Sequence, residues 1–208
     1  LASLLKTILP THGFYAQKFH GLPLDCWEAL PFTTKNDLLA EQTARPPYGD
    51  LLTYPLSRYT RLHQTSGTSG TPLRWLDTPA TWDRMLTSWR TMFEVVGVTA
   101  ADRLLFAFSF GPFLGFWTAF ESASRMGCLC LAAGGLSSGA RLRMLLDNRA
   151  TVVLCTPTYA LHLAELAAKE GIDLAASSVR ALVVAGEPGG NIPATRRRIE
   201  QVWEIGRA

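Results

Sequence analysis

Short apolar runs alternate with longer amphipathic stretches from residue 103 onward. The apolar runs predict strands at 103–108, 128–132, 151–155 and 180–185, and the stretches between or just after them predict helices at 112–126, 138–148, 157–169 and 192–203. Strands of a parallel sheet that is covered on both faces read as nearly continuous apolar runs, because neither face meets water. The pattern therefore predicts the α/β class, with a mostly parallel sheet flanked by helices.

The first part of the chain has a different pattern. Residues 1–58 predict a helical, loop-rich lead-in with a short helix at 35–42. Thr33 or Thr34 is expected to cap this helix, because a threonine oxygen can accept a hydrogen bond from a free amide of the first turn. Composition supports no internal boundary, so we expect one domain made of this lead-in and an α/β part at 59–208.

Two short strands are expected next, at 59–64 and 73–77, joined by a loop of small residues. Thr78 and Pro79 then predict the start of a helix, since proline fits the first helical position, where its missing amide costs nothing. Apolar positions recur in this helix every three or four residues, which indicates one buried face. These positions are Trp82, Met85, Leu86, Trp89, Met92, Phe93 and Val96.

The composition is that of a globular chain. Of its 208 residues, 48% are hydrophobic and 18% are charged, which supplies material for a packed core and excludes a disordered tail. The 20 Lys and Arg against 17 Asp and Glu give a net charge of +3, which is too weak to indicate nucleic-acid binding. The one basic cluster, at 196–198, falls on a predicted helix, and we interpret it as a solvated face.

Cysteine usage and hydropathy indicate neither a secreted nor a membrane protein. Cys26, Cys128, Cys130 and Cys155 lack the spacing of a metal site or a disulfide framework, and the visible start shows no signal-peptide pattern. We therefore expect a cytoplasmic protein. An uncharged run at 104–120 is broken by glycines and a proline, so we interpret it as a buried strand, a turn and a helix rather than a membrane span.

The loop between the two short strands is the most informative feature. It consists of Thr65, Ser66, Gly67, Thr68, Ser69, Gly70 and Thr71, followed by Pro72. Glycines allow conformations that turn successive amides toward one point, and the hydroxyls add donors, which together suit a chain of phosphate oxygens. The loop is not a Walker loop, because its glycine spacing differs and no lysine follows Gly70. From the residues alone, a flexible turn remains an equal alternative.

Five segments, in order, resemble the phenylacetate-CoA ligase family of AMP-forming, adenylate-forming enzymes. The sequence RLHQTSGTSGTP at 61–72 resembles the family's phosphate-loop signature. The other segments are LPFTTK at 30–35, PYG at 47–49, FGPFLG at 110–115 and AGEP at 185–188. The resemblance spans nearly the whole chain but only the first part of the family's large N-terminal domain. It implies an incomplete AMP-binding domain that lacks the family's later segments and mobile C-terminal domain.

The resemblance implies two half-reactions in one site. A carboxylate attacks the α-phosphorus of ATP to give an acyl adenylate and pyrophosphate, and the thiol of coenzyme A then displaces AMP to form a thioester. Residues 65–71 are implied to hold the β- and γ-phosphates, with Mg²⁺ neutralising the remaining charge, so that the loop is a clamp and not a nucleophile. The implied partners are a small-molecule carboxylic acid and the nucleotide. We assign no catalytic side chain and no metal site made of protein side chains.

Two further groups of residues receive roles from the resemblance. The residues implied to border adenine and AMP are Gly186, Glu187 and Pro188. They follow a predicted parallel strand, where open α/β sheets gather their ligands; alternatively, Glu187 accepts amides within an ordinary turn. The residues implied for the acyl pocket are Phe110, Gly111, Phe113 and Gly115. Aromatic residues at this spacing are otherwise explained as core.

The chain departs from the family in its cations. Family loops often carry lysine where this chain has Thr71, and broader superfamily members carry one shortly after the proline, where this chain has Leu73 and Arg74. This loss weakens the case for tight triphosphate binding unless Arg74 turns inward or Mg²⁺ compensates, and we expect Arg74 to face solvent. His63 is expected to be structural, because no carboxylate that could orient it as a base is identifiable nearby.

Three functional hypotheses remain at this point. The first is an acid-CoA ligase, for an aryl or other carboxylic acid, of which this chain is an N-terminal fragment that is inactive alone. The second is a non-catalytic nucleotide-binding or interaction module. The third is an adenylating enzyme that transfers its acyl group to an amine or a carrier protein. Because the strand at 180–185 would form an uncovered sheet edge, we also expect self-association, for example as a homodimer.

Overall fold

A computed structural model describes residues 2–67 and 70–205. The chain forms two compact units. The hairpin unit comprises Leu1–Arg84 and Pro112–Leu114, and the sheet unit comprises Met85–Gly111 and Gly115–Ala208. The chain passes from the first unit to the second within the helix α4 (Pro79–Val95).

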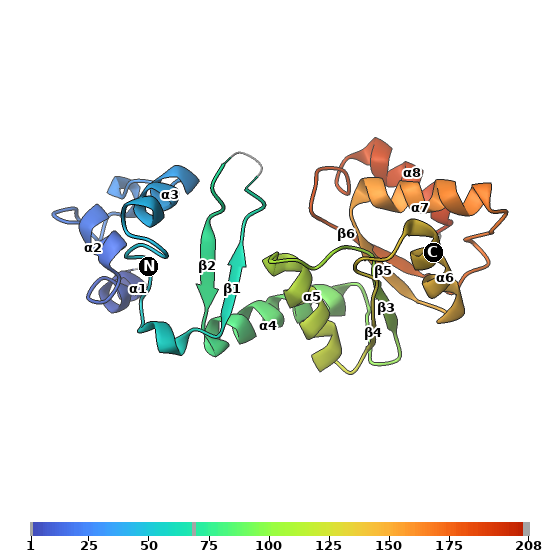
Figure 1. Cartoon of the computed structure of the whole chain (residues 1–208), viewed down its shortest axis with the longest axis horizontal. Coiled ribbons are helices and arrows are strands. Elements are labelled where there is room, and N and C mark those ends of the chain that lie inside the picture. Colours follow the sequence, from blue (N-terminus) through green and yellow to red (C-terminus); the bar gives the residue numbers. More distant parts are fainter. Residues whose placement is uncertain (1, 68–69, 206–208) are drawn as a thin grey trace. The chain divides into compact units, whose positions relative to one another are not determined.

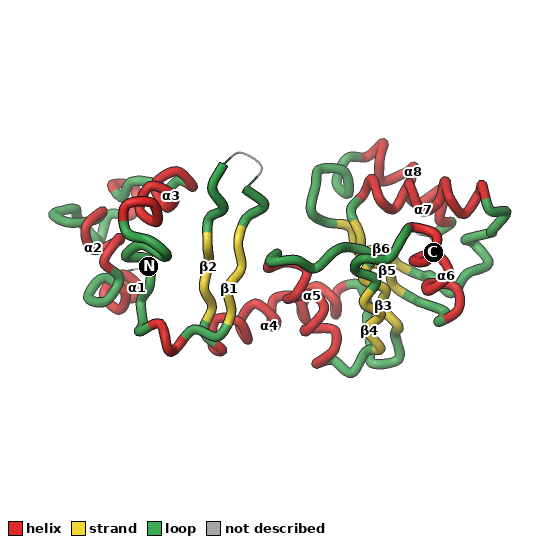
Figure 2. Tube along the Cα trace, in the orientation of Figure 1, coloured by secondary structure: helices red, strands yellow, loops and turns green. Residues whose placement is uncertain are grey.

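The hairpin unit begins with short helices joined by long loops, as the lead-in pattern predicts (Figure 2). These helices are α1 (Ala2–Ile8), α2 (Gly13–Lys18), η1 (Trp27–Ala29), α3 (Lys35–Ala44) and η2 (Leu56–Arg58). Thr34 caps α3: its hydroxyl accepts from the amide of Asp37 at 3.2 Å, and the Asp37 carboxylate accepts from the amide of Thr34 at 3.0 Å. This reciprocal capping satisfies two amides that a helix start leaves free. The predicted cap and helix are confirmed, with the helix continuing to Ala44.

The two predicted short strands are present as β1 (Arg61–Gln64) and β2 (Arg74–Asp77), and they form an antiparallel hairpin in which His63 lies opposite Trp75. One face of the hairpin packs against Trp82 in the first turn of α4. The His63 ring stacks on Trp82 with centroids 5.0 Å apart and planes 5° apart, and the Arg61 guanidinium lies 4.3 Å from the Trp82 ring. Aromatic stacking and a cation-π contact therefore attach the hairpin to the helix.

The sheet unit contains four parallel strands in the order β4-β3-β5-β6 (Figure 1). They are β3 (Arg103–Phe106), β4 (Leu129–Ala132), β5 (Val152–Cys155) and β6 (Ala181–Val184). The helices that connect or follow them are α5 (Leu114–Arg125), α6 (Ser138–Asp147), α7 (Pro157–Lys169) and α8 (Pro193–Trp203). Each predicted strand and helix of this region is present with ends shifted by a few residues. The predicted α/β class is confirmed.

Alternate residues of the central strands point into two separate cores. Leu105 and Val153 pack with α6, α7 and α8, where Trp203 is 1% exposed. Leu104 and Val152 pack on the opposite face with α5 and the second half of α4. Because side chains alternate along a strand, a run of consecutive apolar residues can serve both faces at once. The continuous apolar runs in the sequence are the consequence of this arrangement.

The apolar stripe predicted on α4 is only partly buried. Trp82, Leu86 and Phe93 are buried, whereas Met92 and Val96 are 46% and 38% exposed. The second half of α4 packs on the sheet along a narrower face than the helical period suggests. The predicted burial of Met92 and Val96 was therefore wrong.

A polar network fastens the amino ends of the strands. Asp102 accepts two hydrogen bonds from Arg180, at 3.1 and 2.7 Å, one from the Thr99 amide at 2.8 Å and one from the Thr151 hydroxyl at 2.7 Å. Burial raises the pKa of the Asp102 carboxyl, but these hydrogen bonds and the charge of Arg180 outweigh burial and lower the pKa to about 2. The ionised carboxylate therefore joins the segments that lead into β3, β5 and β6.

Arg196 and Arg198 are exposed and pair with Glu200 and Glu165, which confirms the solvated basic face. All four cysteines are free, and Cys128 and Cys130 pack against the same core. Within residues 2–67 and 70–205, no helix combines the length and the apolar character that crossing a membrane requires. The strand β6 lies at an edge of the sheet, as expected.

Candidate functional site

An apolar cavity of about 130 Å³ lies in the sheet unit at the carboxyl ends of β5 and β6. Ligands of open α/β sheets gather at this edge, because the connecting loops diverge there. Uncharged residues from α4, α5 and the strand ends line the cavity. They are Trp89, Phe108, Gly115, Phe116, Ala119, Leu154, Cys155, Val183, Ala185 and Gly186.

The structure distributes the predicted acyl-pocket residues over different places. Gly115 lines the cavity. Phe110 packs among aromatic rings, with centroid distances of 4.8 Å to Trp117 and 5.3 Å to Phe120. The carbonyl of Gly111 accepts a hydrogen bond from the Trp117 indole at 2.8 Å. Phe113 is half-buried in the Pro112–Leu114 segment of the hairpin unit.

Phe108 and Trp89 line the cavity and were missed as site residues by the sequence reasoning. Phe108 stacks on Phe116 with ring centroids 4.0 Å apart. The signal for Phe108 was its position two residues after Phe106, which places both side chains on the same side of the strand. For Trp89 the sequence shows only the apolar periodicity of a helix. This periodicity does not distinguish a residue that lines a cavity from a residue of the packed core.

Cys155 gives the cavity a thiol that stays neutral. Burial, followed by the negative charge of Glu187, raises the pKa of this thiol to about 12. No lining residue of the cavity carries a charge, so the cavity offers an apolar surface and no fixed cation. An uncharged apolar group is the chemistry that fits it.

The loop that follows β6 runs tightly against the start of α7. A Cβ on Gly189 would lie 2.7 Å from the Cβ of Pro157, and Gly189 has a φ of +153°. A Cβ on Gly190 would lie 2.7 Å from a methyl carbon of Val184. Gly186 has a φ of +92°, which favours glycine. Glycine is therefore required at several positions of this loop.

Glu187 points to the first turn of α7. Its Oε1 atom accepts hydrogen bonds from the Thr158 hydroxyl at 2.6 Å and from the Thr158 amide at 2.8 Å. The hydroxyl and then the amide lower the pKa of the Glu187 carboxyl, so the group is ionised at neutral pH. The alternative that Glu187 accepts amides within its own turn was wrong, because its partner Thr158 belongs to the first turn of α7. Pro188 is exposed next to it.

The glycine-rich loop closes the hairpin. The Thr65 amide donates to the carbonyl of Leu73 at 3.0 Å, and the Thr65 hydroxyl accepts from the Leu73 amide at 3.1 Å. Gly67 has a φ of +69°, and its carbonyl accepts from the Gly70 amide at 2.9 Å. Ser66 and Thr71 are exposed. The other two predicted residues, Thr68 and Ser69, lie outside the described residues.

Arg74 forms hydrogen bonds with residues of the lead-in. Its guanidinium donates to the carbonyl of Pro47 at 3.2 Å, and its side chain is half-buried. Its backbone amide donates to the Gln42 side chain at 3.0 Å, and its carbonyl accepts from the same side chain at 2.7 Å. The expectation of a solvent-facing Arg74 was therefore wrong, because the strand lies against α3.

His63 has a neighbouring carboxylate that sequence reasoning missed. It is buried against Trp82, and its Nδ1 atom lies 3.8 Å from Oδ2 of Asp77. Asp77 lies on the paired strand, two residues beyond the partner of His63, and therefore on the same face. Asp77 also accepts a hydrogen bond from the Thr81 hydroxyl at 3.0 Å, which ties the hairpin to α4. The packing agrees with a structural role for His63.

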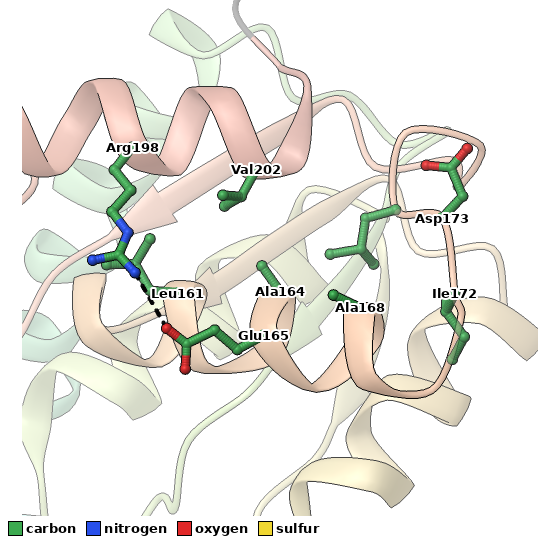
Figure 3. A pocket seen from close by; sticks show the side chains of 9 residues that line it. Leu161, Ala164, Glu165, Ala168, Ile172, Asp173, Arg198 and Val202 are labelled. Carbon is green, nitrogen blue, oxygen red and sulfur yellow. Dashed lines mark hydrogen bonds and ion pairs between the residues drawn. The ribbon is translucent and has the colours of Figure 1, made fainter.

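A larger cavity, of about 320 Å³, lies between α7 and α8 (Figure 3). Leu161 and Ala164 of α7 and Val202 of α8 line it with apolar side chains, and Glu165 and Arg198 pair across it at 3.3 Å. None of the predicted site residues lines it.

In the part of the chain that the structure describes, no group of three His, Cys, Asp or Glu side chains could hold a metal ion.

The chain is similar in sequence to two phenylacetate-coenzyme A ligases. Phenylacetate-coenzyme A ligase of Pseudomonas putida is 29% identical over 209 residues, which covers 95% of this chain and 45% of that protein. Phenylacetate-coenzyme A ligase of Escherichia coli (strain K12) is 28% identical over 173 residues, which covers 83% of this chain and 38% of that protein. The chain thus spans less than half the length of the curated relatives it matches. No protein-family model matches it.

Solved structures extend this similarity to the fold. The crystal structure of 2-hydroxyisobutyryl-CoA ligase in complex with 2-HIB-AMP and CoA matches with a TM-score of 0.91 and 26% identity, covering 98% of this chain and 45% of that one. The N-terminal domain of FACL13 from Mycobacterium tuberculosis matches more distantly, with a TM-score of 0.56 and 17% identity over 80% of this chain and 40% of that one. The chain has the α/β fold of the N-terminal domain of adenylate-forming ligases. It is homologous to the N-terminal part of phenylacetate-coenzyme A ligases.

Proposed function

We propose that the chain is the N-terminal part of an AMP-forming acid-CoA ligase. The observation that carries the proposal is the match of 98% of the chain, at a TM-score of 0.91, to a ligase solved with 2-HIB-AMP and CoA. In this proposal the 208 residues form an incomplete AMP-binding domain, and further segments of a longer protein complete the site. The chain alone is then inactive as a ligase.

The glycine-rich loop is proposed to bind the phosphates of ATP. Gly67 and Gly70 have positive φ values, which allow neighbouring amides to face a common anion. Ser66 and Thr71 are exposed and can add hydroxyl donors. In this proposal Mg²⁺ would bind together with the phosphates and neutralise part of their charge.

The carboxyl edge of the sheet is proposed to hold the nucleotide base and the acyl group. Gly186, Glu187 and Pro188 border the adenine side, and the 130 Å³ cavity receives an apolar acyl group. The carboxylate of the acid then attacks the α-phosphorus, pyrophosphate leaves, and the thiol of coenzyme A displaces AMP. Such a reaction needs positioning and charge neutralisation more than covalent help from side chains.

Exchange of labelled pyrophosphate into ATP tests this proposal. The product of the complete gene that encodes this chain should catalyse the exchange only when an acid is present, because the first half-reaction is reversible. The panel should contain aryl acids and short aliphatic acids, and release of AMP with free coenzyme A should follow for the accepted acid. No exchange with any acid of the panel would refute the ligase assignment.

A second candidate is a nucleotide-binding module without catalysis. The loop has Thr71 where ligases of the family often have lysine, and the guanidinium of Arg74 is bonded to the carbonyl of Pro47. Both facts leave the loop without a cation from these positions. Calorimetry of ATP and AMP with the complete gene product separates the two candidates: binding without acid-dependent exchange favours the module.

A further inference from the structure

The loop after β6 and the start of α7 meet at the carboxyl edge of the sheet and are joined by one carboxylate. The start of α7 follows β5 directly and consists of the N-cap residue Thr156 and the first helical residues Pro157 and Thr158. The loop, at 185–190, follows β6 and contains Glu187. Glu187 reaches from the loop to the start of α7 and accepts hydrogen bonds from both the amide and the hydroxyl of Thr158. We call this pair of hydrogen bonds the clasp.

The backbone of the loop also runs close to Thr156 and Pro157, on both sides of the clasp. Before it, a Cβ on Gly186 would lie 3.5 Å from the methyl carbon of Thr156. After it, a Cβ on Gly189 would come within 2.7 Å of Pro157. The approach is therefore close enough at Gly189 that only glycine fits. A loop packed this tightly has few alternative paths while the clasp is closed.

We propose that Thr158 and Glu187 are positioning residues of the ligase site, a role that rests on the proposed function. The clasp fixes the backbone at 185–188, which we propose to border the nucleotide. It also fixes the wall of the apolar cavity, because Ala185 and Gly186 of the loop line that cavity together with Cys155, which directly precedes Thr156. Glu187 thus acts through the loop that it holds and does not bind the ligand.

The charge and exposure of Glu187 support this assignment over direct binding. An ionised carboxylate repels the anionic phosphates of a nucleotide, whereas at the start of α7 it meets the positive end of the helix dipole. Both Thr158 and Glu187 are exposed, so the clasp contributes little to global stability. Its effect is expected in the local order of the loop and in substrate binding.

Four variants test the clasp. E187A removes both hydrogen bonds, and T158V removes only the one from the hydroxyl. The double variant E187A/T158V removes no hydrogen bond of the clasp beyond those that E187A alone removes. T158S keeps the hydroxyl. E165Q is the matched control. It also neutralises an exposed carboxylate, but that carboxylate lies on α7 and pairs with Arg198.

The first measurement is the KM for ATP in pyrophosphate exchange by the complete gene product. We expect E187A to raise this KM by about tenfold and T158V by about threefold, because the displaced loop binds the nucleotide poorly. The KM of the double variant should equal that of E187A, and T158S and E165Q should match the unchanged protein. If the effects of E187A and T158V multiply instead, Glu187 acts apart from Thr158 and the positioning role is wrong.

The second measurement is amide hydrogen exchange of the segment 185–190 in the 208-residue chain, which needs no substrate. E187A should accelerate exchange in this segment, with the melting temperature within about 2 °C of the unchanged chain. Unchanged exchange in E187A would show that the clasp does not hold the loop. Faster exchange in a protein without acid-dependent pyrophosphate exchange would instead refute the ligase function, and the positioning role with it, while the clasp itself would stand.

Discussion

The sheet unit and the hairpin unit bury different kinds of side chains. In the sheet unit, all four residues of β5 are buried and apolar, and they face two large apolar cores. In the hairpin unit the buried apolar residues are few, and buried polar residues are as prominent. Among residues 2–67 and 70–84 of this unit, the buried apolar residues are Leu5, Phe14, Leu73 and Trp82, and the buried polar residues are His12, Gln42, His63, Asp77 and Thr78.

This difference means that the two units depend on different interactions. Apolar burial is non-directional and tolerates changes of side chain when volume is kept. Hydrogen bonds such as those between Gln42 and Arg74 depend on a particular pair of groups, and the loss of one partner leaves the other unsatisfied. We therefore expect the hairpin unit, which carries the glycine-rich loop, to be more sensitive to the chemical identity of single residues.

Replacement of a buried tryptophan in each unit tests this expectation and should have the largest effect. Trp203 and Trp82 are each 1% exposed. Replacement by alanine should cost about 3–5 kcal/mol of unfolding free energy in either unit, because a large cavity forms. Leucine should recover more than half of the loss at Trp203. At Trp82 it should recover less, since the stacked His63 ring and the Arg61 guanidinium lose their aromatic partner.

Urea unfolding measures these free energies, with hydrogen exchange reporting which unit is affected. The exposed Trp27 provides the control, and its replacement by alanine should change stability by no more than about 0.5 kcal/mol. Equal recovery by leucine at both positions would contradict the distinction between the two units.

Asp102 tests how much a polar network contributes to the stability of the sheet unit, whose cores are otherwise apolar. Its pKa of about 2 lies below the ordinary value of 3.8, so the folded state favours the ionised form. The stabilisation is complete above pH 5 and is lost as the pH falls from about 4 to about 2. The shift corresponds to about 2 kcal/mol. D102N should cost about this much at pH 7.

Urea unfolding of the unchanged chain and of D102N at several pH values measures this contribution. The difference between the two should disappear as the pH approaches 2, because the unchanged chain then loses its ionised Asp102. A difference that persists without change at low pH would show that the network stabilises the sheet unit by packing and not by charge.

Replacement of Gln42 should lower the unfolding free energy less than the replacement of either buried tryptophan or of Asp102. Its side-chain amide pairs with both backbone groups of Arg74 on β2. Q42A should cost about 1–2 kcal/mol, because it leaves two backbone groups of a strand unpaired. The exposed Gln201 on α8 is the matched control, and Q201A should be nearly neutral in the same urea unfolding experiment. Equal costs for both variants would contradict a special role for the Gln42 contact.

The sequence alone determined the parallel sheet, its helices and the cap of α3. These features depend on repeated local patterns: apolar runs, helical periodicity, and a threonine before a helix start. For the same reason the glycine-rich loop could be singled out, since glycine and hydroxyl residues act through their own backbone and side chains. The resemblance to ligases followed from the order of five short segments, and the homology was confirmed by relatives that match most of the chain.

Only the tertiary structure decided which residues meet across the chain. Asp77 approaches His63 because two strands pair, Arg74 reaches Pro47 because β2 lies along α3, and Glu187 reaches Thr158 because β5 and β6 are neighbours. It likewise placed Phe108 at the cavity and Phe110 among packed aromatic rings. Such contacts join residues that are distant in sequence, and local periodicity carries no information about a partner whose position depends on the pairing of strands.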